Sequence, residues 1–151
     1  MIIINGEDES KGEDGRMADR AKITDLWGDY GAGNDQRDFG LLESCFTEDA
    51  SFTVHIAGGD TVGPLQPRKD VMEFFRAALG AQTDRRRHVL TNFRYLEEGA
   101  DHARVAAYLS LVVTDQGSTV TKSAGAYDSE VVLDQGRWRF RSIVLDLDAP
   151  F

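Results

Sequence analysis

The sequence has few of the residues from which several common kinds of site are built. Cys45 is the only cysteine in 151 residues, which excludes an internal disulfide and a zinc site built on several thiolates. Because Cys45 lies in the apolar run LLESCF, we expect a buried, reduced thiol rather than a nucleophile. His55, His88 and His102 include no pair at the spacing that places two imidazoles on one face of a strand or helix. The sequence therefore predicts no metal site.

Long apolar runs and a basic leader are also missing. No run approaches the roughly 20 apolar residues that a membrane span needs. The opening MIIINGEDES turns acidic after only four apolar residues, unlike a signal peptide. We therefore expect a cytoplasmic protein without a membrane partner.

Positive charge is scarce, with 17 Lys and Arg against 26 Asp and Glu and a net charge of −9. This balance opposes binding to nucleic acid, whose affinity for proteins depends on clustered cations. The three arginines at 85–87 form a local patch, for which a solvated loop ahead of a strand is favoured over an anion site. No GxGxxG follows a strand, and neither GxxxxGK[ST] nor GxSxG occurs. We expect no cofactor and no serine-hydrolase chemistry.

The first sixteen residues differ in character from the rest of the chain. MIIINGEDESKGEDGR is rich in Gly, Asp, Glu and Ser after its apolar start and has no sustained period, which predicts a disordered tail or a tag. Met17 opens the regularly patterned part, and a chain of this length suits one buried core. We therefore expect a single domain over residues 17–151.

Apolar spacing predicts three helices in the first half of the chain. An i, i+3, i+4, i+7 stripe favours a first helix, ended by GAG at 31–33; its members are Ile23, Leu26, Trp27 and Tyr30. Asn34 or Asp35 is placed to cap a second short helix, with Asp38 in its first turn. A third helix follows over 67–80, because Pro67 suits a helix start and Gly80 a helix end.

Strand patterns fill the remainder. ASFTVHIAG, residues 50–58, has His55 on the face opposite its apolar row, which predicts a surface or cavity-rim position for this histidine. From residue 88 onward, four strand-like runs are separated by EEGAD, TDQGS and DQG, links that join only antiparallel neighbours. Helices followed by such a meander predict an α+β fold in which helices cover one face of the sheet.

His88 has two interpretations. In a strand that begins at residue 88, it shares one face with Leu90, Asn92 and Arg94, opposite a more apolar row. The apolar row is expected to face a neighbouring layer, so the His88 row faces either water or a partly polar cavity. Periodicity alone favours the first alternative without excluding the second.

Asp35 and several other polar residues carry the same ambiguity. An aspartate just before a helix is usually a cap, which requires no function. Tyr30, Tyr108, Tyr127 and Asp128 suit packing or turn-adjacent positions, although a buried phenol can donate a hydrogen bond to a substrate oxygen. The residues alone leave these alternatives open.

Three stretches resemble the SnoaL-like branch of the nuclear-transport-factor-2-like superfamily. They are LWGDYGAGNDQRDFGLLESCFTEDASF, RRHVLTNFRYL and GAYDSEVVLDQGRWRFRSIVL, in which Trp138 matches the family's usual Gly-x-Trp near the last strand. The resemblance spans about residues 17–148. It implies a cone-shaped α+β barrel with three N-terminal helices packed on a curved, mostly antiparallel sheet.

The resemblance also implies a catalytic dyad. In dehydratases and dehydrochlorinases of this superfamily, a histidine in the strand after the third helix acts as a base with an aspartate from the loop after the first helix. The matching positions are His88 and Asp35, which would then approach within roughly 3.5 Å. An imidazole has an ordinary pKa of about 6.5 and can remove a proton near neutral pH when a carboxylate fixes its tautomer.

The groups that would polarise the substrate are less well matched. AAYLSLVVTD contains no histidine where the dehydratase has a second one, and RSIVLDLDAP places an apolar residue near the dehydrochlorinase's arginine. Tyr30, Tyr108 and Tyr127 are the candidates for this role. Asn92, His55 and Asp128 complete the expected substrate-binding set.

The activity implied is that of a cofactor-independent lyase or isomerase of the dehydratase or cyclase type. Its substrate would be a hydrophobic oxygenated small molecule such as a polyketide or aromatic intermediate, bound in an apolar cone with a few polar groups. Two alternatives stay open. One is a non-catalytic ligand-binding or assembly module like the β subunit of ring-hydroxylating dioxygenases. The other is an epoxide or ester hydrolase in which Asp128 or Asp146 activates water.

Apolar rows in the last strands predict association between subunits. We expect these rows on the outer face of the sheet, where three short helices cannot cover them; they are Val105, Leu109, Leu111, Val113, Ile143, Leu145 and Leu147. A homo-oligomer follows. The resemblance implies a trimer, with a dimer as the second choice.

Overall fold

The computed structural model describes residues 17–151, and the predicted tail at 1–16 lies outside the described residues. The elements in chain order are α1 (Arg20–Gln36), α2 (Phe39–Ser44), β1 (Phe46–Ile56), β2 (Thr61–Leu65), α3 (Arg68–Gly80), β3 (Arg85–Glu98), β4 (His102–Asp115), β5 (Ser118–Asp134) and β6 (Arg137–Leu147). The strands form one sheet in the order β2-β1-β6-β5-β4-β3. All neighbours pair antiparallel except β1 and β6, which pair parallel.

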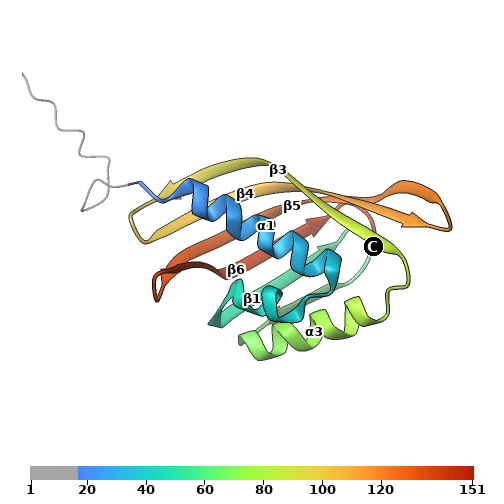
Figure 1. Ribbon diagram of the computed structural model, residues 1–151, viewed down its shortest axis with the longest axis horizontal. Coiled ribbons are helices and arrows are strands. Elements are labelled where there is room, and N and C mark those ends of the chain that lie inside the picture. Colours follow the sequence, from blue (N-terminus) through green and yellow to red (C-terminus); the bar gives the residue numbers. More distant parts are fainter. Residues whose placement is uncertain (1–16) are drawn as a thin grey trace, which may run out of the picture.

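The helices cover one face of the curved sheet (Figure 1). Helix α1 packs against β3 and β6, while α3 packs against β1. The predicted α+β class, with three helices on a curved and mostly antiparallel sheet, is confirmed. The sheet is nevertheless open rather than closed into a barrel, because β2 and β3 are its two edges.

Helix α1 extends beyond the glycines that were expected to end it. It starts after the cap Asp19 and continues through GAG to Gln36, where Arg37 turns into the left-handed conformation at φ 53°. Glycine in a helix costs about 1 kcal/mol relative to alanine, but Gly33 permits a close approach. A Cβ on this residue would stand 3.1 Å from the Cβ and backbone N of Leu42. Tight packing of α2 on α1 therefore overrides the local preference.

Because α1 is longer than predicted, the cap of α2 lies farther along the chain. Asp38 caps α2 by accepting the backbone N–H of Leu41 at 3.0 Å. The prediction of Asn34 or Asp35 as this cap is wrong, since both lie in the last turn of α1. Asn34 is buried and its Nδ2 donates to the Tyr30 carbonyl at 2.9 Å. The Asp35 carboxylate is left available for another partner.

The strands follow the predicted meander with three differences. The four runs expected from residue 88 onward are β3 to β6, paired antiparallel in sequence order, and β3 begins earlier, at Arg85. The run predicted at 50–58 is part of β1, which starts at Phe46. Strand β2 was not predicted, because TVGPL contains glycine and proline, which are depleted in strands and tolerated at an edge.

The core lies between the helices and the inner face of the sheet. The seven residues predicted on the outer face are all buried in this core, so that prediction is wrong; they are Val105, Leu109, Leu111, Val113, Ile143, Leu145 and Leu147. Alternation shows which residues share a face of a strand, but it does not show which of the two faces the helices cover. In this fold the helices cover the more apolar face. The predicted burial of Cys45 is confirmed, and burial raises the pKa of its thiol to about 12.

Candidate active site

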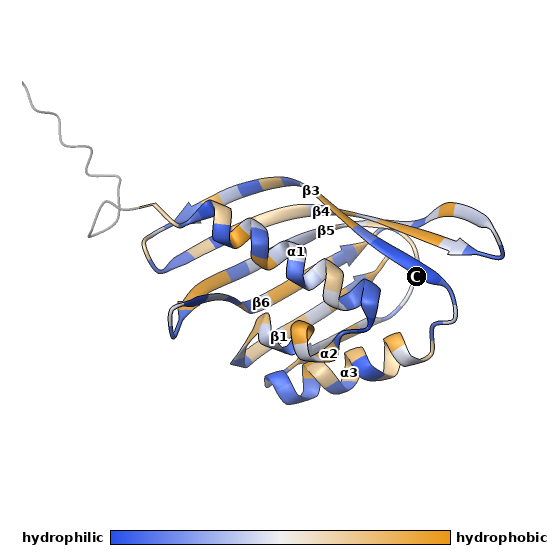
Figure 2. Cartoon of the chain, in the orientation of Figure 1, coloured by the Kyte–Doolittle hydropathy of each residue, from blue (hydrophilic) through white to orange (hydrophobic). Residues whose placement is uncertain are grey.

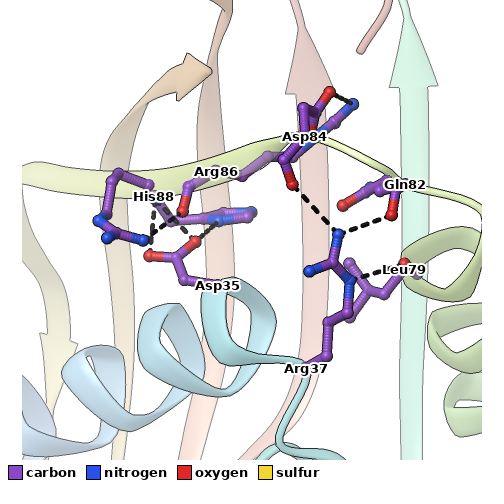
Figure 3. A network of polar contacts seen from close by, with 8 residues as sticks. Asp35, Arg37, Leu79, Gln82, Asp84, Arg86 and His88 are labelled. Atoms are coloured by element: carbon purple, nitrogen blue, oxygen red, sulfur yellow. Dashed lines mark hydrogen bonds and ion pairs between the residues drawn. The ribbon is translucent and has the colours of Figure 1, made fainter. Parts of the chain in front are cut away.

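Asp35 and His88 meet where the end of α1 reaches the start of β3. Asp35 Oδ1 lies 2.6 Å from His88 Nδ1, and the same carboxylate accepts the His88 backbone N–H at 3.0 and 3.1 Å (Figure 3). Each side chain is only 12% exposed. The other ring nitrogen, Nε2, has no hydrogen-bond partner in the part of the chain that the structure describes. The expected approach of the two side chains is met; their catalytic role stays a prediction.

Two local features bring these residues together although they stand 53 positions apart. Gly31 lies one turn before Asp35, and a Cβ on it would stand 3.4 Å from Leu90 Cδ1 and 3.7 Å from His88 Cβ. Helix and strand thus run close to each other. Strand β3 is also an edge, so backbone N–H groups on its outer side have no neighbouring strand. The Asp35 carboxylate binds one of them.

Arg37 ties the end of α1 to the segment that leads into β3 (Figure 3). Its Nε donates to the Leu79 carbonyl at 3.0 Å, and its Nη2 donates to the carbonyls of Gln82 and Asp84 at 2.7 and 3.2 Å. Since Arg37 follows Asp35 by two residues and Asp84 precedes His88 by four, these bonds fix the relative position of the two dyad residues.

His88 lines a cavity of about 60 Å³ between the helices and the inner face of the sheet. Most of its lining is apolar, and the polar members are Tyr30, Asn34, Gln82, Arg86, His88 and Tyr127. A wider and more open groove of about 440 Å³ lies between α1 and β3 and reaches both Asp35 and His88. We take the smaller cavity as the candidate site, because His88 is there joined by other polar groups in mostly apolar surroundings.

The cavity is smaller than a ring-shaped ligand. An apolar cavity of about 150 Å³ holds benzene, so a ring-sized molecule requires lining side chains to move. Phe74 and Phe151 are the large apolar lining side chains best placed to move, because the other apolar side chains larger than alanine that line the cavity are buried. Phe151 is 39% exposed, and the chain end that it forms lies near the start of β3, which Figure 2 colours as hydrophilic.

Tyr30 and Tyr127, two of the predicted substrate-binding residues, both line the cavity; their binding role stays a prediction. Their hydroxyl oxygens are 3.3 Å apart, and both side chains are buried. Burial raises the pKa of each phenol well above its ordinary value. Both therefore keep their protons near neutral pH and can donate hydrogen bonds.

Two predicted substrate-binding residues on β4 and β3 lie outside the cavity. Tyr108 is on the outer face and is 52% exposed, because it alternates with the inward Ala107 and Leu109. Asn92 is exposed at φ 56° within an irregularity of the β3–β4 pairing. This bulge shifts the alternation by one residue, so Phe93 rather than Asn92 packs on the core beyond Leu90.

His55 and Asp128 also lie away from the cavity, on the outer face of the sheet. His55 is exposed, and its Nδ1 lies 3.0 Å from Thr61 Oγ1. Asp128 forms an ion pair with Arg104 at 2.7 Å, with both side chains 44% exposed. Asp146 is exposed as well. Neither of the two aspartates named as examples for the hydrolase alternative, Asp128 and Asp146, lines the cavity.

Arg86, Gln82 and Asn34 line the cavity and were not predicted. Arg86 lies within β3 and is 8% exposed, whereas Arg85 and Arg87 are exposed, so a solvated loop is wrong for this arginine. Strand periodicity carried the signal, because Arg86 precedes His88 by two residues and so shares its face. This signal was missed because the three adjacent arginines were interpreted together as a solvated loop.

Residues 17–151 hold no group of three or more His, Cys, Asp or Glu side chains arranged to bind a metal ion. Within the same residues, no helix combines the length and the apolar character needed to cross a membrane.

The sequence matches the SnoaL-like domain over residues 15–144. The chain belongs to the SnoaL-like family. The resemblance drawn from the sequence motifs is thereby confirmed. In this member of the family, the helices cover one face of an open sheet (Figure 1). A search of curated proteins found no match.

Three solved structures illustrate how far the fold of this SnoaL-like protein is shared. Aln2 from a Streptomyces species is 24% identical with a TM-score of 0.73, covering 85% of this chain and 90% of Aln2. The hexachlorocyclohexane dehydrochlorinase LinA-type3 from Novosphingobium barchaimii is 24% identical with a TM-score of 0.67, covering 85% and 86%. A protein of unknown function with a cystatin-like fold from Nostoc punctiforme is 18% identical with a TM-score of 0.70, covering 86% and 91%. These likenesses concern the fold.

Proposed function

We propose that this SnoaL-like protein is a cofactor-independent lyase or isomerase in which His88 removes a proton next to a substrate carbonyl. The observation that carries the proposal is the 2.6 Å contact between His88 Nδ1 and Asp35 Oδ1. The carboxylate holds the proton on Nδ1, which leaves Nε2 as an unprotonated acceptor. After proton transfer, the same carboxylate stabilises the imidazolium. His88 is the base and Asp35 is the residue that positions it.

Removing a proton next to a carbonyl places negative charge on the carbonyl oxygen. Tyr30 and Tyr127 supply two phenols, 3.3 Å apart, on the wall of the cavity that His88 also lines. In surroundings from which water is excluded, fixed donors stabilise a developing oxyanion strongly. We assign this role to the tyrosine pair. In a dehydration, the hydroxyl on the neighbouring carbon then leaves as water with the proton that His88 Nε2 has accepted, and a C=C bond forms between the two carbons.

The apolar lining favours a hydrophobic oxygenated substrate, such as a polyketide or aromatic intermediate. Phe52, Phe75, Leu109 and Leu145 are among the lining side chains. A similar structure, LinA-type3, is named a hexachlorocyclohexane dehydrochlorinase, and its name describes an elimination, the reaction class proposed here.

The test uses a panel of hydroxytetralones in which the hydroxyl is β to the ketone. Loss of water from such a compound gives a naphthol, whose absorbance is readily followed. We expect turnover by the unaltered protein and its loss in His88→Ala. His55→Ala is the matched control, because His55 is exposed and outside the cavity, and it should keep full activity. Equal rates in His88→Ala and the unaltered protein, or no turnover of any panel member, would contradict the proposed enzyme activity. The alternative of a ligand-binding or assembly module would then be favoured.

We also propose that the protein is a homo-oligomer, a trimer by resemblance with a dimer as second choice. The outer face of the sheet supports this proposal through small side chains rather than through the apolar rows that were expected there. Its middle carries the small side chains Ala106, Ser110, Ala124 and Ala126 in adjacent strands, beside the exposed Tyr108. A second copy can approach a surface of such small side chains closely.

A further inference from the structure

Arg86 is the charged arginine in the wall of a mostly apolar cavity. It precedes His88 by two residues in β3, so both side chains lie on the inner face and line the same cavity. Only 8% of Arg86 is exposed. A guanidinium in such surroundings costs considerable desolvation free energy unless its N–H groups are paired. The partners of these N–H groups therefore indicate what the residue does.

Asp84 pairs with one edge of the guanidinium and leaves the other edge without a hydrogen bond among the described residues. Arg86 Nε donates to Asp84 Oδ1 at 2.8 Å, and Nη2 donates to Oδ2 at 3.3 Å. The remaining edge consists of Nη1 and the second N–H of Nη2. Nη1 has no hydrogen-bond partner among the described residues and is not sealed from solvent. Two parallel N–H groups at such an edge match the two oxygens of a carboxylate.

The local charge also favours an anion at this edge. The hydrogen bond from Arg86 lowers the pKa of Asp84, and the charges of Lys122 and Arg37 act in the same direction. Asp84 therefore stays ionised with three cations near it. This excess of positive charge is unusual in a chain with a net charge of −9. One further carboxylate would offset part of it.

We infer that Arg86 is a specificity-determining residue that binds a carboxylate of the substrate through its free edge, beside His88. The substrate class is thereby narrowed to aromatic or polyketide-like acids. The inference rests on the proposed function in taking this cavity as the substrate site. It concerns binding, however, and its test does not require turnover.

The test measures binding by titration calorimetry for benzoate, phenylacetate and naphthoate, each beside its neutral primary amide of nearly the same shape. In the unaltered protein, we expect at least one carboxylate to bind about tenfold or more tightly than its amide. Arg86→Gln should abolish this preference and leave the affinity for the amide unchanged. Arg85→Gln is the matched control, since Arg85 is exposed on the opposite face of β3, and this variant should keep the preference.

A second variant, Arg86→Lys, keeps the inference testable if Arg86→Gln fails to fold. Arg86→Lys keeps a positive charge near Asp84 but lacks the forked edge, so most of the preference should still disappear. The inference is overturned if no carboxylate is preferred, if none of the probes binds, or if the preference survives both Arg86 variants.

His88→Ala separates this inference from the proposed function. Because the free edge of Arg86 does not involve the imidazole, His88→Ala should keep the carboxylate preference. Loss of that preference in His88→Ala would count against Arg86 as its source. If the unaltered protein turns over no hydroxytetralone yet prefers carboxylates, the catalytic proposal fails and the assignment of Arg86 stands. If turnover of neutral ketones is found without a carboxylate preference, the assignment of Arg86 fails alone.

Discussion

The Asp35 carboxylate binds both the imidazole and the backbone of His88, with Oδ1 2.6 Å from Nδ1 and 3.0 Å from the backbone N. One side chain thus fixes the orientation of the ring and the position of the strand that carries it. An ordinary helix cap would satisfy a nearby N–H of its own helix. Asp35 instead binds a residue 53 positions away, so its contacts indicate a positioning role.

Asp35→Asn should therefore reduce activity far more than stability. The amide oxygen can still accept one N–H, but the charge that stabilises the imidazolium is gone and the ring is no longer held in one tautomer. In a comparable triad this change costs roughly 10⁴-fold in kcat, and we expect a loss of about 10²-fold or more here. The measurement is kcat/KM on hydroxytetralones, with thermal unfolding measured in parallel.

Asp25→Asn is the control for this experiment. Asp25 lies on α1 as well, but it is exposed and outside both the cavity and the groove. It should leave kcat/KM unchanged. Similar rates for Asp35→Asn and the unaltered protein would show that Asp35 has only a structural role.

The regular part of the fold was predictable because its patterns are local. The stripe of Ile23, Leu26, Trp27 and Tyr30 identified α1, and short glycine-bearing links identified the meander of β3 to β6. The end of α1 was missed because its cause is not local. Gly33 is in the helix because Leu42 packs against it, and a single sequence does not reveal that contact.

The site was predictable only in part, for a related reason. The motif resemblance indicated His88 and Asp35, and strand alternation would have indicated Arg86. Alternation failed beyond Leu90, because the bulge at Asn92 exchanges the two faces of β3. Tyr108 was misplaced because alternation leaves open which face the helices cover. These features depend on how strands pair, which propensity does not specify.

High pH should destabilise the protein through Tyr30 and Tyr127. Burial raises the pKa of both phenols in the folded state, so a free phenol in the unfolded chain ionises first, at about pH 10. A group with a raised pKa in the folded state contributes stability that is fully present below the unfolded pKa and is lost as pH rises above it. The melting temperature should therefore fall increasingly above about pH 10.

Tyr127→Phe tests this origin of the pH dependence. The variant removes one ionisable phenol, so its melting temperature should fall less steeply between about pH 9 and 11 than that of the unaltered protein. Tyr108→Phe, on the exposed outer face, should keep the original slope. Equal slopes in all three proteins would contradict the assignment to the buried pair.

Replacing Gly33 by alanine should destabilise the protein, although alanine is the better helix former. The new Cβ would lie 3.1 Å from the backbone N of Leu42, which cannot move without shifting α2. We expect a loss of about 1–3 kcal/mol in the free energy of unfolding. Gly28→Ala is the matched control on the same helix, because no atom other than its chain neighbours and the nearby backbone of its own helix lies within 4 Å of its new Cβ. It should stabilise by up to about 1 kcal/mol. Equal effects of the two substitutions in urea denaturation would contradict the packing argument.

The proposed homo-oligomer should depend on the outer face of the sheet. Tyr108→Glu places a charge beside the small side chains of β4 and β5, without touching the core. Light scattering should show a trimer for the unaltered protein and smaller species for the variant. A monomer at micromolar concentration for the unaltered protein would remove the proposal.

The side-chain hydrogen bonds of Arg37 should stabilise the site by more than its left-handed backbone conformation costs in free energy. At φ 53° it occupies a region that favours glycine, so Arg37→Gly relieves strain while it removes the bonds to Leu79, Gln82 and Asp84. Gln135→Gly is the control for strain alone, since Gln135 has φ 51° in the turn between β5 and β6.

If the bonds of Arg37 outweigh its strain, Arg37→Gly lowers the free energy of unfolding by roughly 1–3 kcal/mol, while Gln135→Gly leaves it unchanged or raises it. The bonds also hold the segment that leads to His88, so hydrogen exchange at residues 82–88 should become faster in Arg37→Gly than in Gln135→Gly. Turnover should also be lower in Arg37→Gly, because the imidazole and the Asp35 carboxylate are no longer held in one relative position. Unchanged exchange at these residues would show that Asp35 alone positions His88, and that Arg37 only ends the helix.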